Sequence, residues 1–210
     1  MAAKINPKRE IEIKLRITNL GEILGRLSKL GAVPRGRVLE QNTLFDTRDS
    51  GFWRQGRLLR LRTQTPAPGN GSRGGPRTTI LTAKAPPSRG RLSSPKKMPY
   101  KERLESELTV GERVRWPRIL GELGFRAGFR YEKYRTSFRL GALHLDLDET
   151  PVGVFLELEG APSAIRRTAR ALGFAPKEHI RATYWDLYAA DCRRFKRKPR
   201  NMLFKSQKSR

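Results

Sequence analysis

Full charges alternate with aliphatic residues along the first strand-like stretch of this chain. That stretch reads "EIEIKLRI" and runs from Glu10 to Ile17. Residues two apart in a β-strand point to the same face, so the charged side chains from Glu10 to Arg16 share one face and the aliphatic ones share the other. The carboxylates of Glu10 and Glu12 repel each other at this spacing unless a positive charge lies between them. The strand therefore requires a positively charged neighbour.

Similar alternation returns in later stretches, and apolar residues at helical spacing appear between them. The helical spacing predicts helices over 18–31, after Pro117, and over 163–174 and 181–192. This order of elements predicts an α+β fold dominated by antiparallel sheet, with helices on the aliphatic face. The stretches predicted as strands are 10–17, 41–47, 57–64, 78–84, 100–110, 130–140, 142–149 and 154–160.

The polar faces of these strands carry both signs of charge. The acids are Glu10, Glu12, Glu105, Glu107, Asp146, Asp148, Glu157 and Glu159. The bases are Lys14, Arg16, Arg60, Arg62, Lys84, Arg103, Lys133 and Arg135. They line either the solvated side of an open sheet or the interior of a curled one. The repetition favours an interior, because a merely solubilising face also tolerates Ser, Thr, Gln and Asn.

An interior with both signs of charge suits a metal–polyphosphate ligand. Carboxylates bind hard divalent cations such as Mg²⁺ or Mn²⁺ through oxygen. Arg and Lys hold phosphate oxygens, and arginine often does so as a bidentate fork. A dication between Glu10 and Glu12 would relieve their repulsion. The pattern therefore predicts metal-assisted phosphoryl chemistry.

Other site chemistries are excluded by what the sequence lacks. Cys192 is its single cysteine, so an internal disulfide and a zinc site built on cysteines are excluded. It contains no Walker-type glycine-rich loop and no Ser/His/Asp or Cys/His nucleophile set. No apolar run is long enough to cross a bilayer, and the first ten residues lack the apolar core of a signal peptide. A cytoplasmic protein is the simplest expectation.

The chain is strongly basic and of a size that favours one domain. Its 210 residues include 45 Lys and Arg against 20 Asp and Glu, a formal net charge of +25, which favours polyanionic partners. The stretch 191–210 is especially basic, and we predict a solvated, flexible tail there; contact with RNA or a membrane surface is the alternative. Two long loops, 65–77 and 85–99, are also predicted to be flexible.

The order of these motifs resembles that of the CYTH superfamily, the triphosphate tunnel metalloenzymes. The matching stretches are "EIEIK", "LRLR", "RLESEL", "YEKYR", "LDLDETPVGVFLELEG" and "TYWDLY". They extend from Glu10 to about Tyr188, so the resemblance implies one CYTH domain over 1–190, followed by the basic tail 191–210. The implied fold is an eight-stranded antiparallel β-barrel, open at both ends, lined by charge and flanked by peripheral helices.

The resemblance also implies roles for individual residues. Glu105 and Glu107 match a position that supports metal or water, while His144 and Asp148 share their strand with Asp146 and line the bore. The residues implied as ligands of Mg²⁺ or Mn²⁺ are Glu10, Glu12, Asp146, Glu157 and Glu159. The residues implied to clamp the triphosphate are Lys14, Arg60, Arg62, Lys84, Lys133 and Arg135.

The function implied first is a divalent-metal-dependent triphosphatase that hydrolyses inorganic, nucleoside or thiamine triphosphate inside the tunnel. A class IV adenylyl cyclase, which makes cyclic AMP and pyrophosphate from ATP, is the second interpretation. A non-catalytic polyanion- or RNA-binding protein is the third. Phe45, Phe52 and Trp53 could stack a ring, although aromatic residues beside a strand more often belong to the core.

Overall fold

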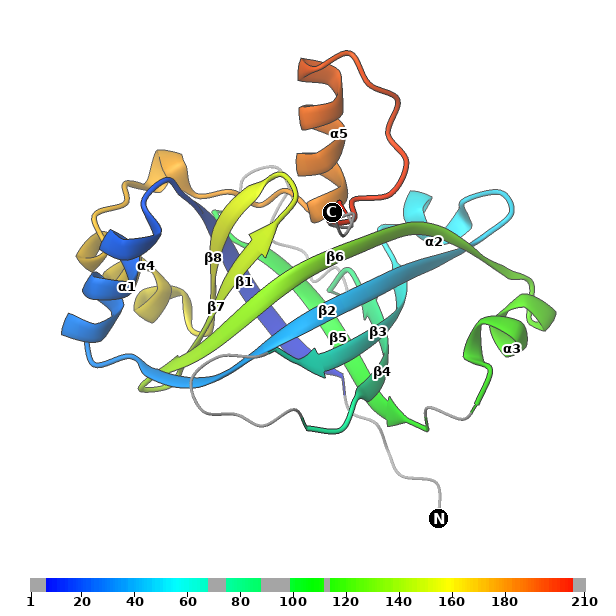
Figure 1. Cartoon of the computed structure of the whole chain (residues 1–210), viewed down its shortest axis with the longest axis horizontal. Helices are drawn as coiled ribbons and strands as arrows, with labels where there is room; N and C mark the ends of the chain where they lie inside the picture. The colour runs from blue at the N-terminus through cyan, green and yellow to red at the C-terminus, as the bar shows by residue number, and fades with distance from the viewer. Residues whose placement is uncertain (1–6, 68–74, 88–98, 112–113, 206–210) are drawn as a thin grey trace, which may run out of the picture.

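A closed ring of antiparallel strands forms the centre of the protein (Figure 1). The computed structural model describes residues 7–67, 75–87, 99–111 and 114–205. The order around the ring is β1-β5-β4-β3-β2-β6-β7-β8, which confirms the predicted eight-stranded barrel with helices around it. The strands are β1 Lys8–Ile17, β2 Val33–Thr47, β3 Leu58–Pro66, β4 Thr78–Ala85, β5 Lys101–Val110, β6 Phe125–Leu140, β7 Leu143–Thr150 and β8 Gly153–Glu159.

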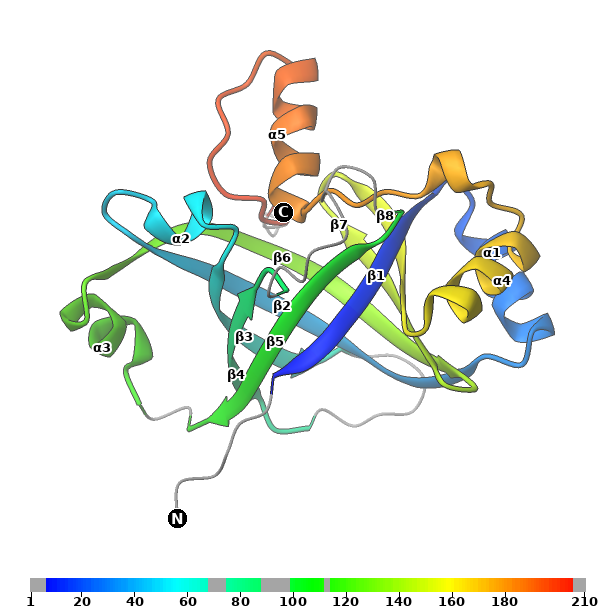
Figure 2. The ribbon, with the colours of Figure 1, turned by 180° about the vertical axis from the view of Figure 1, so that it is seen from behind.

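Strand β1 closes the barrel, because it pairs with a neighbour on each side. Its first half, Lys8 to Glu12, pairs with β5, which runs beside it in Figure 2. Its second half, Glu12 to Ile17, pairs with β8. The open sheet that the sequence also allowed is therefore excluded, and the charged faces of the strands turn into the barrel.

The helices lie outside the ring of strands. They are α1 Leu20–Lys29, α2 Gly51–Arg54, α3 Trp116–Glu122, α4 Pro162–Ala171 and α5 Tyr184–Arg194, with a short 3₁₀-helix η1 at Pro176–Glu178. The four predicted helices correspond to α1, α3, α4 and α5 with shifted ends, whereas the single-turn α2 was not predicted. No helix in the described part of the chain is long and apolar enough to cross a membrane.

The main hydrophobic core lies between the barrel wall and two of these helices. The aliphatic faces of β1, β7 and β8 point outward, and α1 and α4 cover them (Figure 1). Leu15, Leu145 and Leu156 from the strands pack there with Leu27 of α1 and Ile165 of α4. Each such side chain stabilises the fold by about 1.5–3 kcal/mol when it is buried. The helices thus use the aliphatic face and leave the alternate, charged residues to the interior.

The segment after α5 returns to the barrel and packs against β6. Pairing between β6 and β7 begins only at Tyr134, so the preceding part of β6 is free to pair on that side. The N–H of Met202 donates to the carbonyl of Arg130, and the N–H of Glu132 donates to the carbonyl of Met202, both at 2.9 Å. The Met202 side chain is buried. Over residues 191–205 the structure therefore differs from the predicted flexible tail, because backbone pairing and an apolar anchor fix the segment.

Several predictions fall at least partly on residues that the structure does not describe. The predicted loops 65–77 and 85–99 include 68–74 and 88–98, which lie outside the described residues, as does the chain end 206–210. The flexibility expected of these segments stays a prediction. The same holds for a domain boundary near residue 190.

Candidate active site

The interior of the barrel, here called the bore, contains a cavity of 1560 Å³. Charged side chains from all the strands except β2 and β5 supply the metal and clamp residues that the sequence predicted. Those predicted residues, all of which line the cavity, are Glu10, Glu12, Lys14, Arg60, Arg62, Lys84, Lys133, Arg135, Asp146, Glu157 and Glu159. Glu105, Glu107 and His144 line it too, whereas Asp148 is fully buried beside it.

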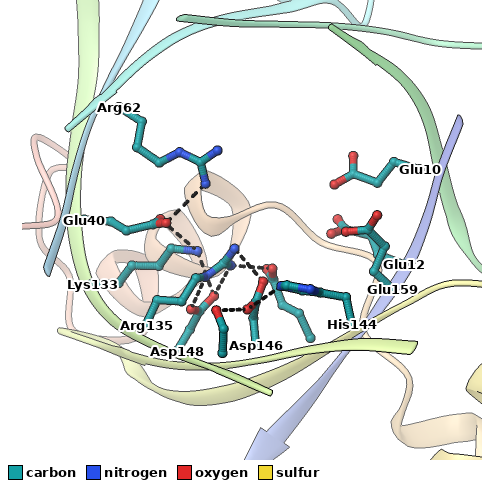
Figure 3. A network of polar contacts seen from close by, with 12 residues as sticks. Glu10, Glu12, Glu40, Arg62, Lys133, Arg135, His144, Asp146, Asp148 and Glu159 are labelled. Atoms are coloured by element: carbon teal, nitrogen blue, oxygen red, sulfur yellow. Dashed lines mark hydrogen bonds and ion pairs between the residues drawn. The ribbon is translucent and has the colours of Figure 1, made fainter. Parts of the chain in front are cut away.

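The predicted metal ligands lie on three neighbouring strands, β7, β8 and β1, and form what we call the acid wall. Asp146 faces Glu157 in the register between β7 and β8, and Glu159 faces Glu12 in the register between β8 and β1. Directly opposed residues of an antiparallel pair have Cβ atoms about 4.5–5.5 Å apart. Figure 3 shows Glu10, Glu12 and Glu159 together at one side of the bore.

Lysines separate the carboxylates along β1. Lys14 Nζ lies 3.1 Å from Glu12 Oε1 and 3.1 Å from Glu157 Oε1, and Lys101 Nζ lies 2.7 Å from Glu12 Oε1. Lys84 Nζ holds Glu10 at 2.7 Å. Burial alone raises the pKa of Glu12, but the nearby ammonium groups of Lys101 and Lys14 bring that pKa far below its ordinary value. Lysine contacts with each carboxylate thus reduce the repulsion between Glu10 and Glu12.

Arg135 of β6 crosses to the acid wall and joins its carboxylates (Figure 3). Its Nη1 lies 2.7 Å from Asp146 Oδ2, and its Nη2 lies 2.6 Å from both Asp148 Oδ2 and Glu157 Oε2. Burial by itself lowers the pKa of Arg135, but the surrounding carboxylates raise it well above its ordinary value. Ser137 Oγ donates to Asp146 Oδ1 at 2.6 Å, and His144 Nε2 lies 3.0 Å from the same oxygen.

The two predicted clamp arginines of β3 share an acidic partner from β5. Glu107 Oε1 lies 2.6 Å from Arg62 Nη2 and 3.4 Å from Arg60 Nη2. The Glu107 side chain is 38% exposed, whereas the side chains of Arg60 and Arg62 are 10% and 9% exposed. An incoming anion can therefore displace Glu107 more cheaply than it can displace a buried acid.

Sequence reasoning missed Glu40 and the buried network around it. Glu40 is fully buried, and its Oε1 accepts hydrogen bonds from Arg62 at 3.1 Å and from Gln64 at 2.9 Å. Lys133 Nζ lies 3.5 Å from Glu40 Oε2 and 2.7 Å from Asp148 Oδ2 (Figure 3). The prediction started β2 at residue 41, eight residues late. Extending the alternation back from Asn42 would have put Glu40 on the charged face.

Tyr184, the first residue of α5, ties that helix to the same network. Its hydroxyl donates to Asp148 Oδ2 at 2.6 Å, and the ammonium groups of Lys14 and Lys133 lie 5.3 and 4.8 Å from the centre of its ring. The side chain is buried against Phe155. Asp148 is thus more than the lining residue that the resemblance implied, since it holds Lys133, Arg135 and Tyr184 together.

Unpaired polar atoms gather on the β2–β3 side of the bore. Among the described residues, six buried side-chain atoms have no hydrogen-bond partner, and five of them belong to Glu40, Asn42, Arg60 and Arg62. Asn42 leaves both its amide oxygen and its amide nitrogen unpaired, and it lies opposite Arg62 in the strand register. Buried polar groups are nearly always paired in folded proteins, so such a gathering is typical of a place where a ligand or water supplies the partners.

The acid wall fits a hard divalent cation by the chemistry of its donors. It offers carboxylate oxygens, the ligands that Mg²⁺ and Mn²⁺ prefer. Within the described residues, no three acidic or histidine side chains gather around one point. The carboxylates instead face Lys14, Lys84, Lys101 and Arg135. Metal binding therefore requires these cations to give up part of their contacts.

The aromatic residues suggested for stacking divide between the core and the cavity. Phe45 and Phe52 pack in an apolar cluster that includes Leu59 and Leu120, and Phe45 also borders the cavity. Trp53 lines the cavity and is 50% exposed. Phe129, Tyr131 and Trp185 also line the cavity, beside the start of α5, and had not been singled out.

The comparison with protein families gives one match, and it spans most of the sequence. The model of the CYTH domain matches residues 8–184, which include every residue of the acid wall and every predicted clamp residue. The chain belongs to the CYTH family. A search of curated proteins finds no match.

Solved structures share the barrel at low sequence identity. A Vibrio parahaemolyticus protein described as a candidate adenylate cyclase is 17% identical, with a TM-score of 0.66 over 87% of this chain and 99% of its own. A Pyrococcus horikoshii protein is 22% identical, with a TM-score of 0.69 over 87% and 99%. A Hippeastrum adenylyl cyclase candidate is 20% identical, with a TM-score of 0.54 over 87% and 96%, and its structure was reported with a dominant triphosphatase activity. At these identities the likeness establishes the fold.

Proposed function

We propose that this CYTH protein is a divalent-metal-dependent triphosphatase that hydrolyses a triphosphate substrate inside the barrel. The observation that carries the proposal is the bore itself, in which the acid wall of β7, β8 and β1 faces buried cations from β3, β4 and β6. A triphosphate with a bound dication complements both sets of charge. CYTH proteins typically are enzymes of the cyclase or triphosphatase kind, which agrees with this proposal.

The cations of the bore would bind and orient the phosphates. Arg60 and Arg62 present guanidinium groups beside the partly exposed Glu107, which a phosphate oxygen can replace. Lys84 and Lys133 offer ammonium groups from the strands on either side of the β2–β3 pair. Arg135 lies between this set and the acid wall, so it can contact a phosphate while it keeps a carboxylate partner. These fixed charges stabilise negative charge that develops on the departing phosphate.

The acid wall would hold Mg²⁺ or Mn²⁺ through Glu10, Glu12, Asp146, Glu157 and Glu159. When bound there, a dication would neutralise charge on the phosphates and would help to activate the attacking oxygen. Lys14 lies between Glu12 and Glu157 and keeps the two carboxylates charged and in place. The third interpretation, a purely RNA-binding protein, does not account for carboxylates on the walls of the bore, because they repel phosphates.

The cyclase interpretation makes an additional demand on the protein. Cyclisation brings the ribose 3′-hydroxyl to the α-phosphate, so it requires a pocket that holds the sugar and base of ATP. The charged residues of the bore recognise phosphate and metal, which every triphosphate shares. The aromatic side chains that line the same cavity and are available to a base are Trp53, Phe129, Tyr131 and Trp185. The dominant triphosphatase activity reported for the Hippeastrum protein also favours hydrolysis as the first proposal.

The test is a product analysis with three substrates. Tripolyphosphate, ATP and thiamine triphosphate are incubated with Mg²⁺ or Mn²⁺, and the products are separated by chromatography. Release of orthophosphate that EDTA abolishes supports the proposal and names the substrate. Pyrophosphate together with cyclic AMP from ATP would establish the cyclase instead. A metal–triphosphate complex that binds the folded barrel should also raise the melting temperature, by an amount that grows with its concentration.

A further inference from the structure

The C-terminal segment 193–205, which we call the basic arm, has a fixed position on the barrel. In addition to the backbone pairing of Met202, the N–H of Arg130 donates to Asn201 Oδ1 at 3.0 Å. The N–H of Phe204 donates to Glu132 Oε2 at 3.1 Å, and the Phe204 ring packs on Tyr134 with 5.2 Å between the ring centres. The arm therefore presents its remaining side chains as a defined surface.

That surface is strongly positive. The arm itself contains no acidic residue, and the nearest acid in the sequence is Asp191. Asp191 pairs with Arg197 at 2.7 Å, so it does not neutralise the other cations of the arm. Such a density of charge attracts a phosphodiester backbone and releases its counterions. The exposed cations of the arm are Arg193, Arg194, Lys196, Arg197, Lys198, Arg200 and Lys205.

An exposed aromatic ring lies within this positive surface. Phe195 directly follows α5 as its C-cap and is 57% exposed. The guanidinium carbons of Arg194 and Arg197 lie 5.3 and 5.4 Å from the centre of its ring. Aromatic rings among backbone-binding cations are how proteins stack the bases of single strands without reading their sequence. Insertion of the same ring into a lipid bilayer would carry two guanidinium groups toward the hydrocarbon, which is costly.

We propose that the basic arm binds single-stranded nucleic acid, with its cations on the phosphates and Phe195 stacked on a base. The site is distinct from the acid wall, because no acid-wall carboxylate lies in the arm. Neither Phe195 nor the cations from Arg193 to Lys198 line the bore cavity, whereas Arg200 does. Binding by the arm should therefore be independent of divalent metal and of the phosphohydrolase reaction.

The first test measures fluorescence anisotropy of a labelled twelve-nucleotide oligouridylate that carries no terminal phosphate, in the presence of EDTA. The arm variant Arg193→Gln/Arg194→Gln/Lys198→Gln should weaken binding at least tenfold. It should also reduce the slope of log K against log salt by about 2, since each lost contact removes about 0.7. The matched control, Lys29→Gln/Arg167→Gln/Arg170→Gln, makes the same change of charge on exposed positions of α1 and α4, on another side of the barrel (Figure 1). An equal loss in the control variant would overturn the proposal, because binding would then follow net charge alone.

The second test separates stacking from other modes of contact. Phe195→Ala and Phe195→Leu should both weaken binding of the single strand several-fold and leave binding of a duplex of the same length unchanged. The corresponding oligodeoxyuridylate, which differs only in the sugar, tells whether the ribose 2′-hydroxyl contributes. Triphosphate turnover and melting temperature should stay at wild-type values in all arm variants. Binding to vesicles with 30% phosphatidylserine but not to either oligonucleotide would overturn the proposal and assign the arm to a membrane surface.

Discussion

At the scale of single residues, the bore is a set of buried charges that depend on one another. Lys14 is 3% exposed and has two carboxylate partners, and Arg135 has three. Removing one partner of a buried pair costs about 3–5 kcal/mol, because the other charge is left uncompensated. Substitutions that keep shape and hydrogen bonding are therefore the proper probes of this site.

The change Glu157→Gln should lower kcat for triphosphate hydrolysis by at least a hundredfold. Gln keeps the shape and the contact with Arg135 but removes a charged oxygen from the acid wall. The variant should also lose most of the rise in melting temperature that Mg²⁺–tripolyphosphate causes. Glu122→Gln on the exposed surface of α3 is the control and should behave as wild type. Wild-type turnover in Glu157→Gln would remove that residue from the proposed metal set.

The change Asn42→Leu should stabilise the protein and weaken substrate binding at the same time. Asn42 is 2% exposed and both its amide atoms lack partners, so an apolar side chain of similar size removes a desolvation cost. We expect thermal unfolding to show a gain of about 1 kcal/mol. If the amide contacts the ligand, KM for the triphosphate should rise severalfold. An unchanged KM would show that the unpaired amide serves only the fold.

At the scale of elements, the pairing of the C-terminal segment with β6 connects the end of the chain to the barrel wall. The segment occupies the part of β6 that β7 leaves free, and Met202 packs in a buried cluster with Tyr131 and Tyr184. The same stretch of β6 carries Lys133 on its inner face. Packing of the last residues is thus linked to the strand that positions Lys133, a proposed clamp residue.

Replacement of Met202 by alanine should destabilise the protein by about 2–5 kcal/mol, since this is the usual cost of emptying a buried site of that size. Leu203, the next residue, is 41% exposed, so Leu203→Ala is a matched control with an expected effect within about 0.5 kcal/mol. Chemical denaturation of both variants measures the difference. Equal stabilities would show that the C-terminal segment does not hold the barrel.

Strands in which charged and aliphatic residues alternate could be predicted from the sequence. Segments held by contacts with a distant part of the chain could not. The motifs around Glu10, Arg60 and Glu157 predict both a strand and a charged face, and all three residues line the cavity. Glu40 was missed because it precedes the stretch that was read as a strand. The packing of Met202 was missed because it depends on free backbone groups of a distant strand, which leave no pattern in the sequence.

At the scale of the whole molecule, the buried carboxylates set how the fold responds to pH. Burial alone raises the pKa values of Glu12, Glu40, Asp146 and Glu157, but neighbouring Lys and Arg residues bring each of them below its ordinary value. A carboxyl with a lowered folded-state pKa stabilises the fold above its unfolded pKa of about 4, and this contribution disappears as the pH falls through the folded value. Burial raises the pKa of two further carboxyls, those of Glu10 and Asp148. Protonation of these two groups at low pH favours the folded state, so they oppose the loss of stability.

The melting temperature should therefore fall as the pH is lowered from about 5 to 3, because the carboxyls with a lowered pKa outnumber those with a raised pKa. Circular dichroism at a series of pH values measures this. Glu12→Gln should start from a lower melting temperature at pH 7 and show a shallower fall, since it has lost one of the titrating groups. A melting temperature that rises toward pH 3 would mean that Glu10 and Asp148 dominate.

The closure of the barrel by β1 has a consequence for how the chain is made. The strands that flank β1 begin only at Lys101 and Gly153, so β1 leaves the ribosome long before either partner exists. Until then it carries two open edges and a row of charged side chains that lack their partners on β5 and β8. Contacts between such distant segments form slowly, because the chain loses conformational entropy before the contacts begin to stabilise it. A nascent chain that stops before β8 has no closed ring, and we expect it to depend on chaperones or to be degraded.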